Sequence, residues 1–111
     1  VGVVPHMHLL GKTMRVTATL PDGTEQCLID ISRWNYNWQD EYYYERPFKL
    51  PAGTTLQVAA SFDNSAANPA NPSLPPRRVT WGDGTTDEML FCFFLLTAER
   101  PADLMTVIFD N

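Results

Sequence analysis

Hydrophobic and polar residues alternate with a period of two along much of the chain, which is the pattern of half-buried β-strands. The clearest run alternates four hydrophobic residues with polar ones: Met14, Val16, Ala18 and Leu20. The turn signal Pro21-Asp22-Gly23 follows, and the next strand places three residues on one face: Cys27, Ile29 and Ile31. No stretch of ten or more residues has hydrophobic positions at helical spacing. The sequence therefore predicts an all-β fold.

The same patterns predict further strands near residues 42–50, 54–63, 77–81, 88–97 and 105–109. Residues 64–76 contain four prolines and three asparagines and predict a long loop. About seven short strands joined by turns are typical of an antiparallel β-sandwich or jelly roll. We expect residues 1–111 to form a single domain of this kind.

The predicted strand at residues 89–96 is hydrophobic on both faces. Four residues share one face, Met89, Phe91, Phe93 and Leu95, and the residues between them share the other. An antiparallel strand of this kind usually has both faces covered. We expect the second face to be covered by a missing domain, a partner subunit or a loop that folds back over the sheet.

Charge and length exclude several classes of partner. Lys and Arg total 8 against 13 Asp and Glu, so the net charge is −5 and no basic face is available for nucleic acid or anionic lipid. The longest hydrophobic run is far shorter than the roughly 20 residues of a membrane span. The chain opens with Val1-Gly2-Val3-Val4 and no initiator Met, as expected of a domain excised from a larger protein.

The two histidines of the chain are His6 and His8. In a strand they point to the same face, so their imidazoles can converge on one metal ion, although two partly exposed histidines in an ordinary strand would show the same spacing. A carboxylate as third ligand would suit iron(II), with the candidates Glu25, Asp87 and Glu88. A thioether would select copper, with the candidates Met7, Met14, Met89 and Met105.

Two separated motifs carry a family resemblance. They are Pro-His-Met-His-Leu-Leu-Gly-Lys at residues 5–12 and Gly-Thr-Thr-Asp-Glu-Met at residues 84–89. Together they resemble the C-terminal, oxygen-activating copper domain of the copper type II, ascorbate-dependent monooxygenases, the family of peptidylglycine α-hydroxylating monooxygenase and dopamine β-monooxygenase. The long loop at residues 64–76 is more similar to that of bacterial members. The resemblance implies that His6, His8 and Met89 ligate the catalytic copper.

The resemblance also implies what the parent protein contains. The family has a preceding domain with a second copper, held by three histidines, that supplies an electron, and ascorbate or another one-electron donor serves the parent enzyme. This chain has no histidine left for that site, so by itself it should bind one copper and be unable to complete coupled turnover. Family membership further implies an extracytoplasmic location, either periplasmic or secreted.

The chain departs from the peptide-processing member at the substrate site. Where that enzyme has a carboxylate-binding Arg and two polar residues, this sequence has Val4, Phe91 and Phe93. An unpaired carboxylate in such an apolar pocket would cost several kcal/mol. The sequence therefore predicts a neutral or aromatic C–H substrate rather than a peptide carboxylate.

Three further features allow two readings each. Asp87 and Glu88 could orient the histidines or simply solvate a turn. Cys27 and Cys92 fall on predicted core faces, as a disulfide or as two buried thiols. Alternating aromatic residues, Trp34, Tyr36 and Trp38, form either a platform for a sugar ring or a packed strand pair. The platform reading supports an alternative function, a non-catalytic copper- or carbohydrate-binding module.

Overall fold

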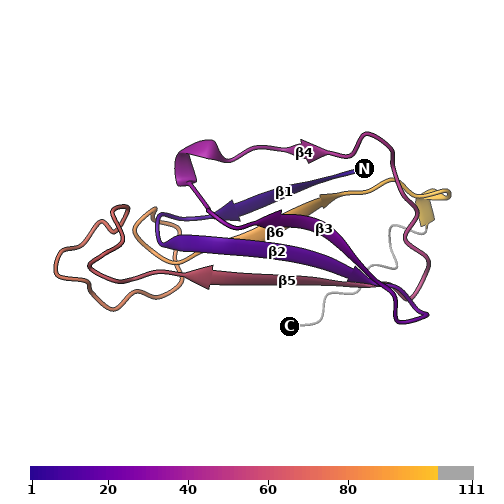
Figure 1. The fold of residues 1–111 in the computed structure, drawn as a ribbon. Helices are drawn as coiled ribbons and strands as arrows, with labels where there is room; N and C mark the ends of the chain where they lie inside the picture. Colours follow the sequence, from indigo (N-terminus) through magenta and orange to yellow (C-terminus); the bar gives the residue numbers. More distant parts are fainter. Residues whose placement is uncertain (103–111) are drawn as a thin grey trace.

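A computed structural model of the chain describes residues 1–102. Its strands are β1 (Gly2–Met7), β2 (Gly11–Thr19), β3 (Glu25–Ile31), β4 (Tyr42–Tyr43), β5 (Thr55–Phe62) and β6 (Leu90–Leu95). One short 3-10 helix, η1 (Tyr36–Trp38), lies between β3 and β4 (Figure 1). The predicted all-β class is confirmed.

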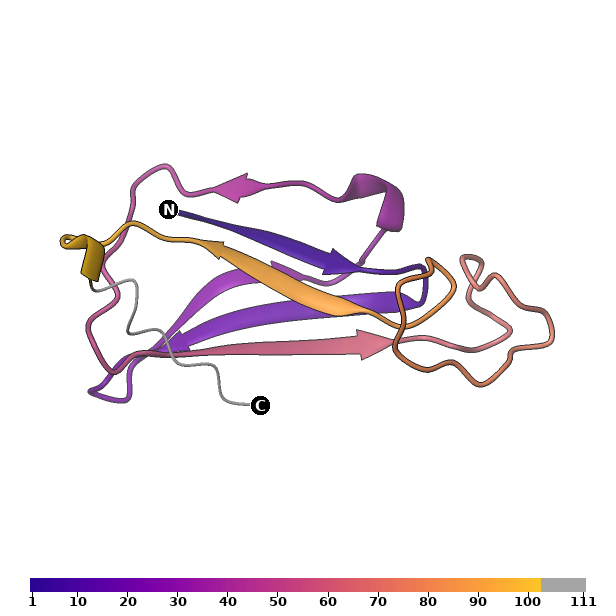
Figure 2. The same ribbon diagram turned by 180° about the vertical axis from the view of Figure 1, so that it is seen from behind.

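The strands form two three-stranded antiparallel sheets, one in the order β4-β1-β6 and the other in the order β3-β2-β5. The two sheets contribute to one core, whose buried members are Met7, Met14, Val16, Ala18 and Leu28. Both views show β1 and β6 running beside each other over β2 and β5 (Figure 2). A complete sandwich or jelly roll stays a prediction. In the described part of the chain, no helix has the length and apolar character needed to cross a membrane.

Strand parity is confirmed for β2 and β6. Met14, Val16 and Ala18 are fully buried, as their alternation with polar residues predicts. Three residues of β6 pack against the core, Leu90, Cys92 and Phe94. The alternate side chains Phe91 and Phe93 face outward and are 42% and 58% exposed. The outer face of the β4-β1-β6 sheet therefore presents aromatic rings that residues 1–102 leave uncovered.

Strand parity fails for Cys27, which is exposed rather than in the core. The cause is a β-bulge, because Val16 pairs with Ile29 but the next residue, Thr17, pairs with Cys27. Leu28 is therefore the extra residue on β3, and it turns inward to an exposure of 8%. From Leu28 back to the start of β3, each side chain therefore points to the face opposite to the one that the sequence alternation predicts.

Both cysteines are free thiols in the structure, and they differ in environment. Burial raises the pKa of the Cys92 thiol from 9.0 to about 11. Because the thiolate is the nucleophile, iodoacetamide at pH 8 should label Cys27 much faster than Cys92. Folded stability should also fall between about pH 9 and pH 11, since the unfolded chain releases the Cys92 proton at the lower pH.

Mass spectrometry of the labelled chain, with a Cys27→Ser control, measures both labelling rates. Two modified thiols in the order Cys27, then Cys92, are the expected result. A chain with no reactive thiol until it is reduced would instead show that the two cysteines form a disulfide.

Three predicted strands need correction or fall outside the description. The strand predicted at 42–50 is reduced to Tyr42–Tyr43, since Pro47 follows closely and cannot donate to a ladder. No strand forms at 77–81, where only an isolated bridge joins Trp81 to Glu88, because this segment hydrogen-bonds to its own turn instead of to a sheet. The strand predicted at 105–109 lies outside the described residues. The predicted loop at 64–76 is confirmed, and Asn71 is buried within it.

Candidate metal centre

The two histidines lie at one end of the sheets. His6 is the penultimate residue of β1, and His8 follows the last residue of that strand. The start of β6, the helix η1 and the connections after β5 lie toward the same end, as Figure 1 and Figure 2 show from opposite sides. The site is therefore assembled from segments that are distant in the sequence.

His8 is held by the main chain of the turn before β6. Its side chain is almost fully buried, at 4% exposure, and its Nδ1 lies 3.2 Å from the carbonyl oxygen of Asp87. A carbonyl oxygen only accepts hydrogen bonds, so Nδ1 must carry the proton and donate it. The lone pair of neutral His8 is then on Nε2, the atom that remains for a metal ion.

His6 is held in the same way by a side-chain amide. Its Nδ1 lies 2.5 Å from Oε1 of Gln39. The amide orientation is fixed, because Nε2 of Gln39 donates to the carbonyl oxygen of Tyr36 at 3.0 Å. The oxygen must therefore face His6, whose Nδ1 donates to it. His6 also keeps its Nε2 lone pair available, and donation of the second ring N–H to an oxygen is typical of metal-ligating histidines.

The spacing of the two rings suits one shared ion. Their centroids are 5.1 Å apart, and their planes are nearly perpendicular at 87°. A metal–nitrogen bond of about 2 Å puts a ring centroid about 3 Å from the ion, so two imidazoles at a near-tetrahedral angle have centroids roughly 5 Å apart. The separation of the two rings is therefore the one expected for imidazoles that share one ion.

The fold restricts the identity of the third ligand. Among residues 1–102, no group of three or more His, Cys, Asp or Glu is placed to hold a metal ion, so the carboxylates predicted as alternatives do not join the pair. The Met7 and Met14 side chains are fully buried in the core, and Met105 lies outside the described residues. The β1–β6 ladder ends at the Met7–Leu90 pair, and His8 and Met89 are the residues next to that pair in the chain.

Two nitrogen donors and a soft thioether are a donor set that favours copper(I) over zinc(II). Met89 is 9% exposed, which is compatible with a ligand covered by its own site. The residues present therefore fit the copper that the sequence motifs imply. Their role as ligands stays a prediction.

Asp87 was predicted to orient a histidine, and it contacts His8 through its main-chain carbonyl rather than through its carboxylate. The carboxylate turns back to accept the N–H of Gly84 at 3.1 Å and lies against Gly82, where a Cβ atom would collide with it. Glu88 makes main-chain hydrogen bonds to Thr80 and Gly82. The two acidic residues thus build the turn that presents the Asp87 carbonyl to His8.

The residues predicted to line a substrate site lie beside His6. In the β1–β6 ladder His6 is paired with Phe91 and Val4 with Phe93, and paired residues of antiparallel strands project to the same face. The two phenylalanine rings stack with centroids 5.9 Å apart and an interplanar angle of 28°. The approach to His6 along the outer face is therefore apolar.

Sequence reasoning missed Gln39 and gave Tyr36 a different setting. Both residues lie more than twenty positions from the histidines in the sequence. The aromatic pattern of their segment allowed a packed strand pair, whereas in the structure the segment forms η1 and lies against the end of β1. The Tyr36 ring is 6.3 Å from the His8 ring. A lone glutamine in a polar loop carries no local signal of such a role, because only the tertiary fold brings it to His6.

Removing the Gln39 acceptor should weaken copper binding by about 10–100-fold, the usual effect of losing a partner that orients a ligating histidine. The variant Gln39→Met keeps the volume but leaves Nδ1 of His6 without an acceptor. Gln39→Glu keeps an oxygen in place and should bind copper more tightly than Gln39→Met. Competition with a copper(I) chelator measures the affinities, and equal affinity in wild type and Gln39→Met would contradict the assignment.

No family model, no curated protein and no solved structure matches this chain.

Proposed function

We propose that this chain is the copper-binding domain of an ascorbate-dependent monooxygenase that uses O2 to hydroxylate a C–H bond of a neutral substrate. The observation that carries the proposal is the similar hydrogen bonding of His6 and His8: each ring has Nδ1 on an oxygen, and within residues 1–102 neither Nε2 makes a hydrogen bond. The motifs at residues 5–12 and 84–89 support the same ligand set. The proposal places the protein outside the cytoplasm, in the periplasm or secreted.

Each residue of the site has a defined task under this proposal. His6, His8 and Met89 hold the ion, and the Gln39 amide and the Asp87 carbonyl fix the orientation of the imidazoles. Bound copper supplies one-electron redox chemistry toward O2. A thioether ligand favours the reduced ion, which is the state that reacts with O2.

The apolar approach determines which substrates can reach the site. Phe91, Phe93 and Val4 offer hydrophobic contact and no cation to pair with a carboxylate. A charged group brought there would lose its hydration without compensation, whereas a neutral C–H surface would gain from leaving water. The arrangement favours substrates that are neutral near the reacting carbon.

The isolated copper-loaded chain should yield no hydroxylated product in proportion to ascorbate consumed. Hydroxylation needs two electrons, a single copper changes by one, and the chain has no third histidine for a second copper site. Ascorbate should instead reduce O2 to hydrogen peroxide and be oxidised to dehydroascorbate. Oxygen uptake, peroxide and product are measured together on candidate substrates.

The matched control is His8→Ala, which should lose both copper binding and peroxide formation. Product equal to ascorbate consumed, from this chain alone, would contradict the need for a second copper domain. Ascorbate oxidation that is unchanged in His8→Ala would contradict the copper site itself.

A further inference from the structure

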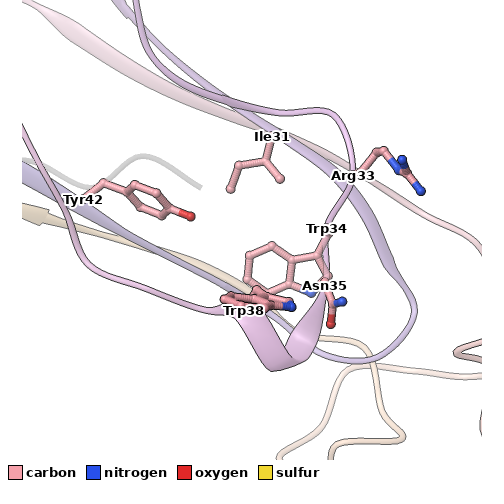
Figure 3. Close-up of a pocket in the computed structure, with 6 residues that line it drawn as sticks. All are labelled: Ile31, Arg33, Trp34, Asn35, Trp38 and Tyr42. Atoms are coloured by element: carbon pink, nitrogen blue, oxygen red, sulfur yellow. The ribbon is translucent and has the colours of Figure 1, made fainter.

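A groove of about 430 Å³ opens beside the histidine site, at the edge where the two sheets present β3 and β4. Its lining comes from the end of β3, the segment through η1 and β4: Ile31, Arg33, Trp34, Asn35, Trp38 and Tyr42 (Figure 3). The volume lies in the roughly 300–1,000 Å³ range of small-molecule sites. None of the proposed copper ligands lines it.

The groove is dominated by aromatic rings. Figure 3 shows Trp34 and Trp38 on one side and the Tyr42 ring opposite, with the Tyr42 hydroxyl directed toward the indoles. The Arg33 guanidinium points away from the rings. Trp38 is 79% exposed, so its indole adds little to the core and is available to a ligand.

Contacts within the protein hold the main chain of this segment and the Trp34 ring before any ligand binds. Asn35 caps η1, with its side-chain oxygen accepting the N–H of Asn37 at 2.9 Å. The main-chain N–H of Trp34 donates to the Lys12 carbonyl at 2.8 Å, and the Trp34 ring packs over Gly11, where a Cβ atom would lie only 2.8 Å from Cδ1. A preformed aromatic surface binds with a smaller loss of conformational entropy than a mobile one.

We propose that this groove binds a neutral sugar ring, and that the substrate of the adjoining copper site is therefore a neutral glycan. A pyranose presents a face of C–H groups that stacks on an indole and a rim of hydroxyls that both donate and accept. Within residues 1–102 the Tyr42 hydroxyl has no hydrogen-bond partner, and the Asn35 amide nitrogen is also unused. The turned-away Arg33 leaves no cation facing a carboxylate, which favours a neutral sugar.

The groove and the histidines share one turn of the chain. Trp38 lines the groove, and the next residue, Gln39, holds His6. Tyr36, in the same helix, contacts the ring of His8. The residue that lines the groove and the residue that holds His6 are therefore neighbours in the chain, and only the assignment of the glycan as substrate rests on the proposed function.

The test uses the metal-free chain and a panel of neutral hexasaccharides with gluco, manno and xylo backbones, measured by tryptophan fluorescence and calorimetry. At least one should bind, and Trp38→Ala should weaken it at least tenfold. The matched control is Trp81→Ala, which removes an exposed tryptophan that does not line the groove. Tyr42→Phe, which keeps the ring and removes the hydroxyl, should weaken binding by a smaller factor.

Absence of binding by every hexasaccharide at millimolar concentration would overturn the proposal. So would binding that Trp38→Ala leaves unchanged, or Trp38-dependent binding of a proline-rich peptide in place of a sugar. Copper binding is measured separately on the same variants. Sugar binding without copper binding would contradict the proposed monooxygenase function but support the sugar site. Copper binding without sugar binding would contradict the sugar site but leave the proposed monooxygenase function standing.

Discussion

Copper(I) bound to this chain should show nitrogen and sulfur scatterers by X-ray absorption, and the sulfur should disappear in Met89→Ile. The reason is positional, because Met89 and His8 are the residues next to the Met7–Leu90 pair that ends the β1–β6 ladder, while the Met7 and Met14 side chains are fully buried in the core. Loss of a ligand should weaken copper(I) binding by more than the roughly 100-fold upper effect of losing an orienting partner.

Two controls separate ligation from general damage. Met105→Ile removes a thioether elsewhere in the sequence and should keep the sulfur signal. Circular dichroism of Met89→Ile checks that the strands remain. A sulfur scatterer that survives in Met89→Ile would refute the assignment of Met89, and its loss in Met105→Ile would transfer the ligand role to that residue.

Met14→Ala should lower the free energy of unfolding by about 2–5 kcal/mol, the usual cost of replacing a buried methionine by alanine. Met14 is fully buried at the centre of β2, where it is paired with Ile31 of β3 and Ala60 of β5. A small domain has only about 5–15 kcal/mol of stability, so this single change removes a large part of it. Urea titration followed by fluorescence measures the difference.

The neighbouring variant Arg15→Ala is the matched control for the same strand. Arg15 points outward and its ion pair with Asp30, at 3.3 Å, is solvent-exposed, so its loss should cost less than about 1 kcal/mol. Equal destabilisation by the two variants would contradict the burial of Met14 and the face assignment of β2.

Much of the fold is readable from the sequence because alternation has a direct physical cause. Side chains on a strand alternate between faces, so Met14, Val16 and Ala18 could be placed in the core without any knowledge of their partners. The same rule predicted that Phe91 and Phe93 share one face of their strand, and both are exposed in the structure. Two histidines two residues apart would share one face if they lay in a strand, and their rings are neighbours in the structure.

Prediction of the buried face from alternation failed where the pairing between strands departs from a regular ladder. The bulge at Leu28 shifts the pairing of β3 with β2, and in the sequence its sign is a hydrophobic residue, Leu28, on the otherwise polar face of the strand. The segment at 77–81 has strand-like residues, but its hydrogen bonds close on its own turn around Glu88.

The sequence by itself determined the all-β class and the core face of β2, and it predicted His6 and His8 as metal ligands. Only the tertiary structure decided how that pair is oriented, because Gln39 and the Asp87 carbonyl reach His6 and His8 across 33 and 79 residues of chain. It also decided that Met7 and Met14 are core residues, which leaves Met89 as the remaining methionine among residues 1–102. Local patterns encode which face a side chain takes, whereas a ligand set depends on which distant backbones meet.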